Sequence, residues 1–126
     1  MSNFEISRRT EGSKDEAVEV LGLKGQLDAH TFGTLQNTLE ALVSQNQPRV
    51  ILNCQELSYI SSAGLGVLKK MTREFREREG DLRLAALNSK INSVMDLLGF
   101  SQVIRVFPDL NQAVESYQEP PAGPEA

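Results

Sequence analysis

Hydrophobic and polar positions divide the chain into short segments that alternate between strand and helix patterns. Apolar stretches at residues 4–6 and 17–23 flank the polar run at residues 11–16, which has the composition of a hairpin loop. Further along, Val50, Ile51 and Leu52 form a short β-branched-rich run typical of a strand that is buried on both faces. The pattern therefore predicts a β-hairpin, followed by a strand at residues 49–53 that lies centrally in a sheet.

Four other segments show apolar residues at the three- and four-residue steps of a helix. The first follows Asp28, which can cap it, and stops at Gln47-Pro48. The second runs over residues 62–79, with Gly80 as its expected stop. The third covers residues 89–98 and is closed by Gly99, and its expected inward residues are Ile91, Val94, Met95 and Leu98. The fourth opens with a capping box at Asp109 and Gln112.

Two further runs, at residues 81–86 and 103–107, have strand character. The order β-β-α-β-α-β-α-β-α predicts one α/β domain with a mixed, mostly parallel sheet of about five strands packed with four helices. This domain is expected to cover residues 1–117. Residues 118–126 contain three prolines and are expected to form a disordered tail.

Composition narrows the class of protein. The chain has 126 residues, 40% hydrophobic and 24% charged, with no long apolar run and no secretory leader, which predicts a cytoplasmic protein that does not insert into membranes. Its net charge of −4 argues against a nucleic-acid partner, because phosphate contacts need a dense cationic face.

Candidate catalytic chemistry is sparse. His30 is the only histidine and is expected in the first turn of a helix, while Cys54 is the only cysteine and is expected to be buried and inert. Neither a nucleophile–base pair nor a metal cluster can be assembled from these residues. Gly64 and Gly66 do not complete a dinucleotide fingerprint, because Lys69 stands where the third glycine would be. We therefore expect no enzyme activity, no metal and no cofactor.

The segment Ser61-Ser62-Ala63-Gly64-Leu65-Gly66 carries the most information. Either serine can cap the helix that begins there. Each glycine costs roughly 0.5–1 kcal/mol against alanine within a helix. We therefore expect something to approach the backbone closely at these positions, either a neighbouring strand or another protein.

This segment resembles the STAS domain of anti-sigma factor antagonists, whose signature is Asp-Ser-Ser/Thr-Gly-Leu-Gly at the same turn. Gly25-Gln26-Leu27-Asp28 is similar to the family's Gly-x-Leu-Asp, and residues 50–53 match its central strand. The resemblance covers residues 4 to about 117. Ser61 departs from the pattern, because it replaces the aspartate of the signature and so removes a negative charge beside the next serine.

The resemblance implies a bacterial regulator of transcription that works by partner switching. Such a protein binds an anti-sigma factor that is also a serine kinase, and thereby releases the sigma factor. Phosphorylation, expected on Ser62 with Ser61 as second choice, reverses the binding, and a serine phosphatase restores it. The implied partner-binding residues are Asp28, Ser61, Ser62, Ala63, Gly64, Leu65 and Gly66, and the expected state is a monomer or weak dimer.

Two points stay open at the level of sequence. Asp28 can either orient Ser62 or cap the helix that follows it. The chain can alternatively be a STAS subunit of an ABC-type membrane transport complex, docked on its ATPase without a phosphorylation cycle. Ser62 and both glycines favour the switch.

Overall fold

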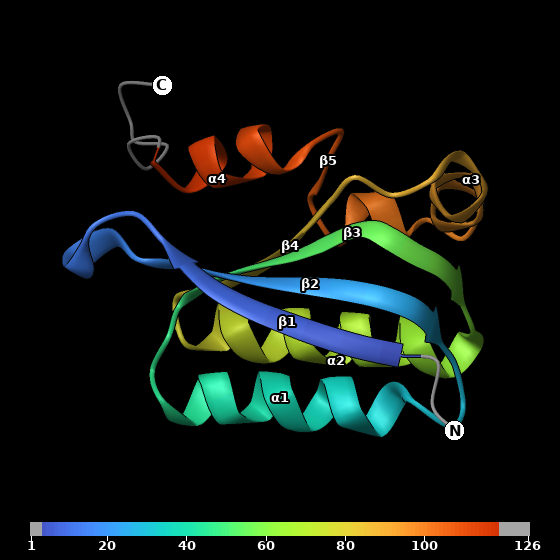
Figure 1. Cartoon of the computed structure of the whole chain (residues 1–126), viewed down its shortest axis with the longest axis horizontal. Helices are drawn as coiled ribbons and strands as arrows, with labels where there is room; N and C mark the ends of the chain where they lie inside the picture. The colour runs from blue at the N-terminus through green and yellow to red at the C-terminus, as the bar shows by residue number, and fades with distance from the viewer. Residues whose placement is uncertain (1–3, 119–126) are drawn as a thin grey trace.

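An open sheet of five strands carries helices on both faces (Figure 1). The structure is a computed structural model that describes residues 4–118. β1 is antiparallel to β2, and each later pair of neighbours is parallel. This arrangement confirms the predicted α/β fold with a mixed, mostly parallel sheet. The strands, in their order across the sheet, are β1 (Phe4–Glu11), β2 (Val18–Leu27), β3 (Arg49–Ile60), β4 (Asp81–Ala85) and β5 (Val106–Phe107).

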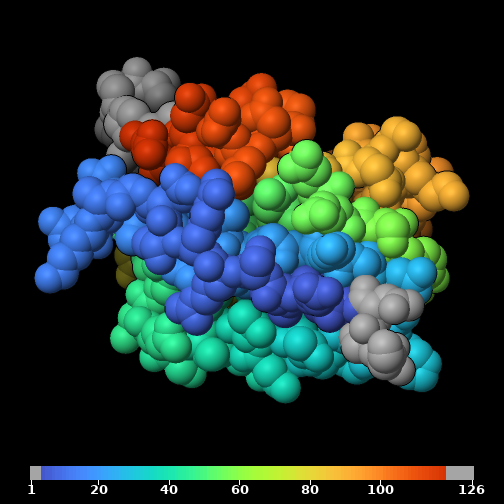
Figure 2. Space-filling view, in the orientation of Figure 1, coloured from blue at the N-terminus to red at the C-terminus, as the bar shows by residue number. Residues whose placement is uncertain are grey.

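The helices form two layers around this sheet. Helices α1 and α2 cover one face, α4 covers the other, and α3 lies near the carboxyl end of β3 (Figure 1). In the space-filling view, β1 is exposed between α1 and α4 (Figure 2). The four helices are α1 (Phe32–Ser44), α2 (Ser62–Glu77), α3 (Ser89–Leu97) and α4 (Leu110–Gln118), and two short 3-10 helices are η1 (Lys14–Glu16) and η2 (Phe100–Gln102).

The central strands bury both of their faces. Leu52 belongs to the larger apolar cluster, which also contains the buried residues of α1 and α2, whereas Ile51 belongs to a smaller cluster with Ala113 of α4. Alternate residues of a strand point to opposite faces, so one strand supplies both clusters. The predicted central position of Val50 to Leu52 is confirmed.

Four strands differ in length from their prediction. β1 continues past residue 6 to Glu11, because it pairs with β2 along its whole length. β2 continues to Leu27 and β3 to Ile60, because their second halves pair with each other, Gly25 opposite Leu57 and Leu27 opposite Ile60. Two register shifts interrupt this pairing and break the alternation that a sequence pattern depends on. In contrast, β5 contains only two residues instead of five, because η2 and the turn after it occupy the preceding chain.

Gly80 follows α2 and takes part in its stop, as predicted, but the left-handed residue of this stop is Glu79. The helix ends at Glu77, and Glu79 takes the left-handed conformation with φ of 63°. The N–H of Gly80 then donates to the carbonyl of Phe75 at 2.8 Å. A Cβ at Gly80 would clash with the backbone of Pro48. Glycine is therefore required there for close approach of two chain segments.

Helix α3 corrects one prediction, and helix α4 agrees with another. In α3, Ile91 and Met95 are buried as predicted, but Val94 and Leu98 are exposed, because this short helix contacts the domain through a narrow face. Gly99 ends it with φ of 78°. The N–H of Gln112 donates to the Asp109 carboxylate at 2.8 Å, as the capping prediction requires.

The predicted boundary of the tail also shifts. Gln118 is the last residue of α4 and is not part of a disordered tail. The rest of the predicted tail, residues 119–126, lies outside the described part of the chain.

A polar cluster fastens α4 to the amino ends of β3 and β4. The Tyr117 hydroxyl lies 2.9 Å from the carbonyl oxygen of Val50 and 2.7 Å from that of Asp81. The Arg83 guanidinium lies 3.9 Å from the centre of the Tyr117 ring and donates to Ser116 Oγ at 2.7 Å. One aromatic side chain thus joins a helix to two strands.

Candidate functional site

The turn between β3 and α2 is built on Ser61. Its backbone is extended, and its side-chain oxygen accepts a hydrogen bond from the N–H of Gly64 at 3.2 Å. Its own N–H donates to the carbonyl oxygen of Leu27 at 2.8 Å. Ser61 is therefore the N-cap of α2, and it also links the ends of β2 and β3.

Ser62 is the first residue of α2 and is exposed. Because Ser61 performs the capping, the Ser62 hydroxyl is not needed for it. Within residues 4–118, no hydrogen bond involves the Ser62 side chain. Ala63, the next residue, is half-buried. The turn thus displays one serine hydroxyl to solvent at the amino end of a helix.

The two glycines of the segment have different surroundings. A Cβ at Gly64 would lie 2.9 Å from side-chain carbons of Leu27 and Ile60, and 3.0 Å from the Leu27 carbonyl oxygen. A Cβ at Gly66 would meet nothing within 4 Å, and Gly66 is exposed. Close packing with a neighbouring strand therefore explains Gly64 but not Gly66.

Leu65 belongs to the core and not to the surface. Its side chain is 6% exposed and lies in the main apolar cluster. Of the six residues from 61 to 66, only Ser62 and Gly66 are exposed. A protein that approaches this turn would meet those two residues first.

Asp28 lies next to the serine turn but bonds to its own loop. It directly follows Leu27, whose carbonyl accepts from Ser61. Its Oδ1 accepts from the N–H of His30 at 2.9 Å, and Thr31 Oγ1 accepts from the N–H of Asp28 at 2.9 Å. The hydrogen bond from His30 lowers the pKa of Asp28 below its usual value. Asp28 is therefore ionised at neutral pH.

These contacts correct two predictions. The N-cap of α1 is Thr31, so Asp28 caps a turn before the helix and not the helix itself. His30 also precedes the helix instead of lying in its first turn. Among the described residues, no hydrogen bond joins Asp28 to Ser62. The structure brings the two residues into the same region without direct bonding.

Sequence reasoning missed one exposed aromatic residue beside the turn. Tyr59 is 50% exposed, near the end of β3 and two residues before Ser61. The predicted strand ended at residue 53, so this position was not assigned to a strand. An isolated tyrosine before the Ser-Ser pair was the only available signal.

Residues 4–118 contain no group of three or more histidine, cysteine, aspartate or glutamate side chains that could hold a metal ion. None of its helices has both the length and the apolar character needed to cross a membrane.

Comparison with known proteins identifies the same family that the sequence of this turn resembles. The family model for the STAS domain matches residues 11–113. A Bordetella bronchiseptica protein, assigned as the anti-sigma factor antagonist BtrV, is 31% identical over 98 residues, which are 78% of this chain and 82% of the relative.

Solved structures show the same fold. An anti-sigma factor antagonist from Mycobacterium paratuberculosis superposes with a TM-score of 0.77 at 19% identity, covering 91% of this chain and 96% of the other. The Bacillus cell fate determinant SpoIIAA, solved in its phosphorylated form, gives a TM-score of 0.65 at 21% identity, with coverage of 87% and 98%. By sequence match and by fold, the chain belongs to the STAS domain family.

Proposed function

We propose that this chain is an anti-sigma factor antagonist controlled by phosphorylation of Ser62. In its unmodified form it binds an anti-sigma factor that is also a serine kinase, and the sigma factor is released. The kinase transfers the γ-phosphoryl group of ATP to Ser62 Oγ, and the modified chain dissociates. A serine phosphatase removes the phosphate and restores binding.

Exposure of Ser62 is the observation that carries this proposal. The phosphoacceptor of a kinase must enter the active site of another protein, so its hydroxyl must be accessible. Ser62 meets this requirement, whereas Ser61 is half-buried and its oxygen accepts from Gly64. Ser62 is therefore the better acceptor.

The position of Ser62 explains how a phosphate would act. The group would add about −1.5 to −2 charges to a small turn that must contact another protein closely. Repulsion and desolvation would then weaken docking. The same phosphate would lie at a helix N-terminus, where free N–H groups and the helix dipole favour an anion. The modification therefore changes the interface while the fold is retained.

Gly66 supports a protein–protein contact at this face. Its missing side chain has no explanation within the described residues. A glycine one turn after Ser62 leaves the helix backbone open on the same side of α2. A partner that approaches Ser62 can therefore also approach the backbone near Gly66.

Related proteins favour the antagonist over a transport subunit. The Bordetella relative is assigned to the antagonists, and SpoIIAA has been solved with a phosphate in place. The chain acts as a binding protein, and the ATP chemistry belongs to its partner. We place the protein in the cytoplasm, where sigma factors meet RNA polymerase.

Ser62→Ala and Ser62→Asp variants test the proposal. The anti-sigma factor is first identified by capture on the wild-type chain and then purified. Ser62→Ala should retain affinity and resist phosphorylation, whereas Ser62→Asp should bind about tenfold or more weakly, the effect of charge placed against an interface.

Ser89 provides a matched control. It is also an exposed first residue of a helix, and it follows the N-cap Asn88 as Ser62 follows Ser61. Ser89→Asp should bind like the wild type, and mass spectrometry after incubation with the kinase and ATP should find phosphate on Ser62 but not on Ser89. Equal affinities of the Ser62→Ala and Ser62→Asp variants would contradict the proposal.

A further inference from the structure

The face of α2 that begins at Ser62 continues along the helix as a single stripe. Steps of four, three, four and three residues lead from Ser62 through Gly66, Lys69 and Arg73 to Arg76. Such spacing keeps residues on one side of an α-helix. All five residues are exposed. The stripe changes from uncharged at the serine turn to cationic in its second half.

The cationic half of the stripe borders a groove of about 320 Å³. Val103, the residue after η2, lies on the groove and is 38% exposed. An apolar contact and several cations therefore share one concave surface. The lining residues are Lys69, Thr72, Arg73, Arg76, Glu77 and Val103.

Two of these cations lack partners. Arg76 bonds to Asp81 at 2.9 Å, and the nearby Lys70 lies 3.5 Å from Glu40. Within residues 4–118, neither Lys69 nor Arg73 makes an ion pair or a side-chain hydrogen bond. The groove is thus lined by three cations, two of them without an ion pair, and by one carboxylate, Glu77, so its lining is net positive on a chain whose net charge is −4.

We propose that this groove binds an acidic segment of the anti-sigma factor, with carboxylates at Lys69 and Arg73 and an apolar side chain against Val103. The inference rests on the proposed function and assigns the chemistry of the partner at the same interface. Charge complementarity selects the occupant, because two unpaired cations attract carboxylates and repel basic segments. Continuity with the Ser62 face places the groove within reach of the same partner.

The groove also explains how one phosphate can affect a wide interface. Seven residues of helix separate Ser62 from Lys69, a rise of about 10 Å at 1.5 Å per residue. This separation is well within the Debye length of roughly 30 Å at 0.01 M salt, whereas the Debye length falls to about 8 Å at physiological salt. At low salt a phosphate on Ser62 would therefore repel the acidic segment held at Lys69, and Gly66 places no side chain between them.

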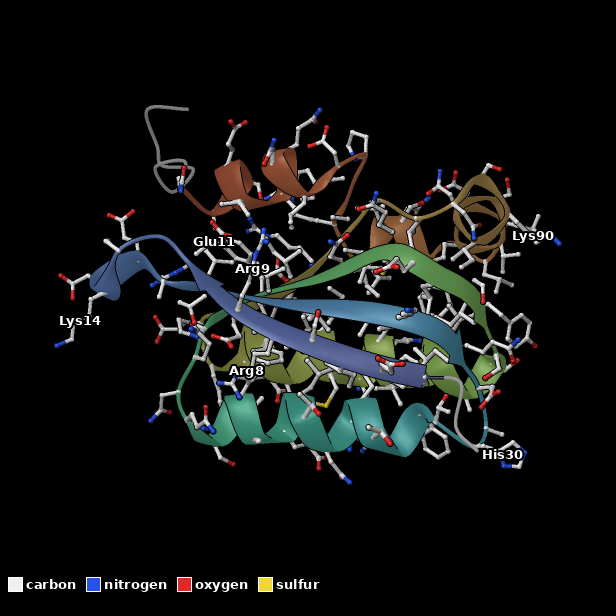
Figure 3. All side chains as sticks on the ribbon, viewed as in Figure 1. Arg8, Arg9, Glu11, Lys14, His30 and Lys90 are labelled. Carbon is white, nitrogen blue, oxygen red and sulfur yellow. The ribbon has the colours of Figure 1, made fainter. Side chains whose placement is uncertain are left out.

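Charge reversal at Lys69 tests the groove directly. The purified anti-sigma factor is titrated against the wild type, Lys69→Glu, Arg73→Glu and Lys14→Glu. Lys14 is the matched control, because it is an exposed lysine of η1 that does not line the groove, and its side chain points away from the sheet (Figure 3). Each variant changes the net charge from −4 to −6, since one positive charge is replaced by one negative charge.

Lys69→Glu and Arg73→Glu should each weaken binding by about tenfold or more at low salt, and Lys14→Glu by less than about threefold. Wild-type affinity should fall as salt rises, and it should fall less for Lys69→Glu, because the screened attraction has been removed. Thermal unfolding of each variant should match the wild type, since both cations are exposed and unpaired.

Failure of the inference and failure of the proposed function give different results. If the wild type binds and Ser62→Asp weakens binding, but Lys69→Glu and Arg73→Glu bind like Lys14→Glu, the groove is not the docking site and the switch stands. If Lys69→Glu weakens binding while Ser62→Asp does not, the groove stands and the switch is wrong. If the wild type binds no anti-sigma factor, both are overturned.

Discussion

The backbone N–H of Ser61 donates a hydrogen bond of 2.8 Å to the carbonyl oxygen of Leu27. This bond joins the carboxyl ends of two parallel strands that are far apart in the sequence. It places Asp28 beside the start of α2 and fixes the backbone from which Ser62 is displayed. The two motifs recognised in the sequence thus meet at one point of the fold.

The two serines should differ in their effect on stability. Ser61→Ala removes the N-cap and should lower the free energy of unfolding by about 1 kcal/mol, within the usual range for such caps. Ser62→Ala should change it by less than about 0.5 kcal/mol, as for an exposed residue without partners. Urea unfolding measures both, and a larger loss for Ser62→Ala would show that the capping assignment is reversed.

The two glycines should respond to alanine in opposite directions. Gly64→Ala forces a methyl group against Leu27 and Ile60 and should destabilise the fold by about 1–3 kcal/mol. Gly66→Ala has free space and better helix propensity, so it should stabilise the fold by about 0.5–1 kcal/mol.

Binding should follow the reverse pattern at Gly66. The added methyl group lies on the proposed contact face, so the more stable Gly66→Ala variant should bind the anti-sigma factor more weakly. Thermal unfolding and titration of the same sample separate the two effects. Unchanged affinity would mean that no partner approaches the backbone at Gly66.

The hydroxyl of Tyr117 should contribute measurably to stability. Tyr117→Phe leaves the carbonyl oxygens of Val50 and Asp81 without this partner and should cost about 1–3 kcal/mol. Tyr59→Phe is the matched control, because its ring is half exposed, and it should cost less than about 0.5 kcal/mol. Equal unfolding midpoints for the two variants would argue against the role of Tyr117.

Cys54 should make stability depend on alkaline pH. Burial raises the pKa of its thiol to about 12 from the ordinary value of 9.0. Between these values the folded chain keeps the proton while the unfolded chain loses it, so stability falls as pH rises from 9 to 12.

A variant that lacks the thiol isolates this effect. Cys54→Ala should show a shallower loss of stability over pH 9–12, although its stability at neutral pH is lower because of the smaller side chain. Urea unfolding at several pH values measures the difference. Parallel pH profiles of the two proteins would contradict the assignment.

Much of the fold could be predicted from the sequence, because the apolar residues have a clear periodicity in the elements that pack one regular face, or both faces, against the core. The spacing of apolar residues in α1 and α2 and the run from Val50 to Leu52 predicted their elements correctly. The second half of β3 was missed because register shifts against β2 disrupt its alternation. The exposed side of α3 was also missed, because periodicity shows which residues share a face but not how much of that face is covered.

The candidate site was less predictable at the level of single atoms. The sequence allowed either serine to cap the helix, since capping depends on where the helical dihedral angles begin. One residue of difference decides which hydroxyl is free. Likewise, both glycines looked alike in the sequence, and only their neighbours in space separate the packed Gly64 from the open Gly66.

The polar cluster at Tyr117 and the turn at Ser62 lie at opposite ends of the sheet. Duplicated copies of the gene can therefore accumulate substitutions around the turn and acquire new recognition specificities while the residues that hold the scaffold together stay fixed. Several such paralogues could then operate in one cell without cross-talk.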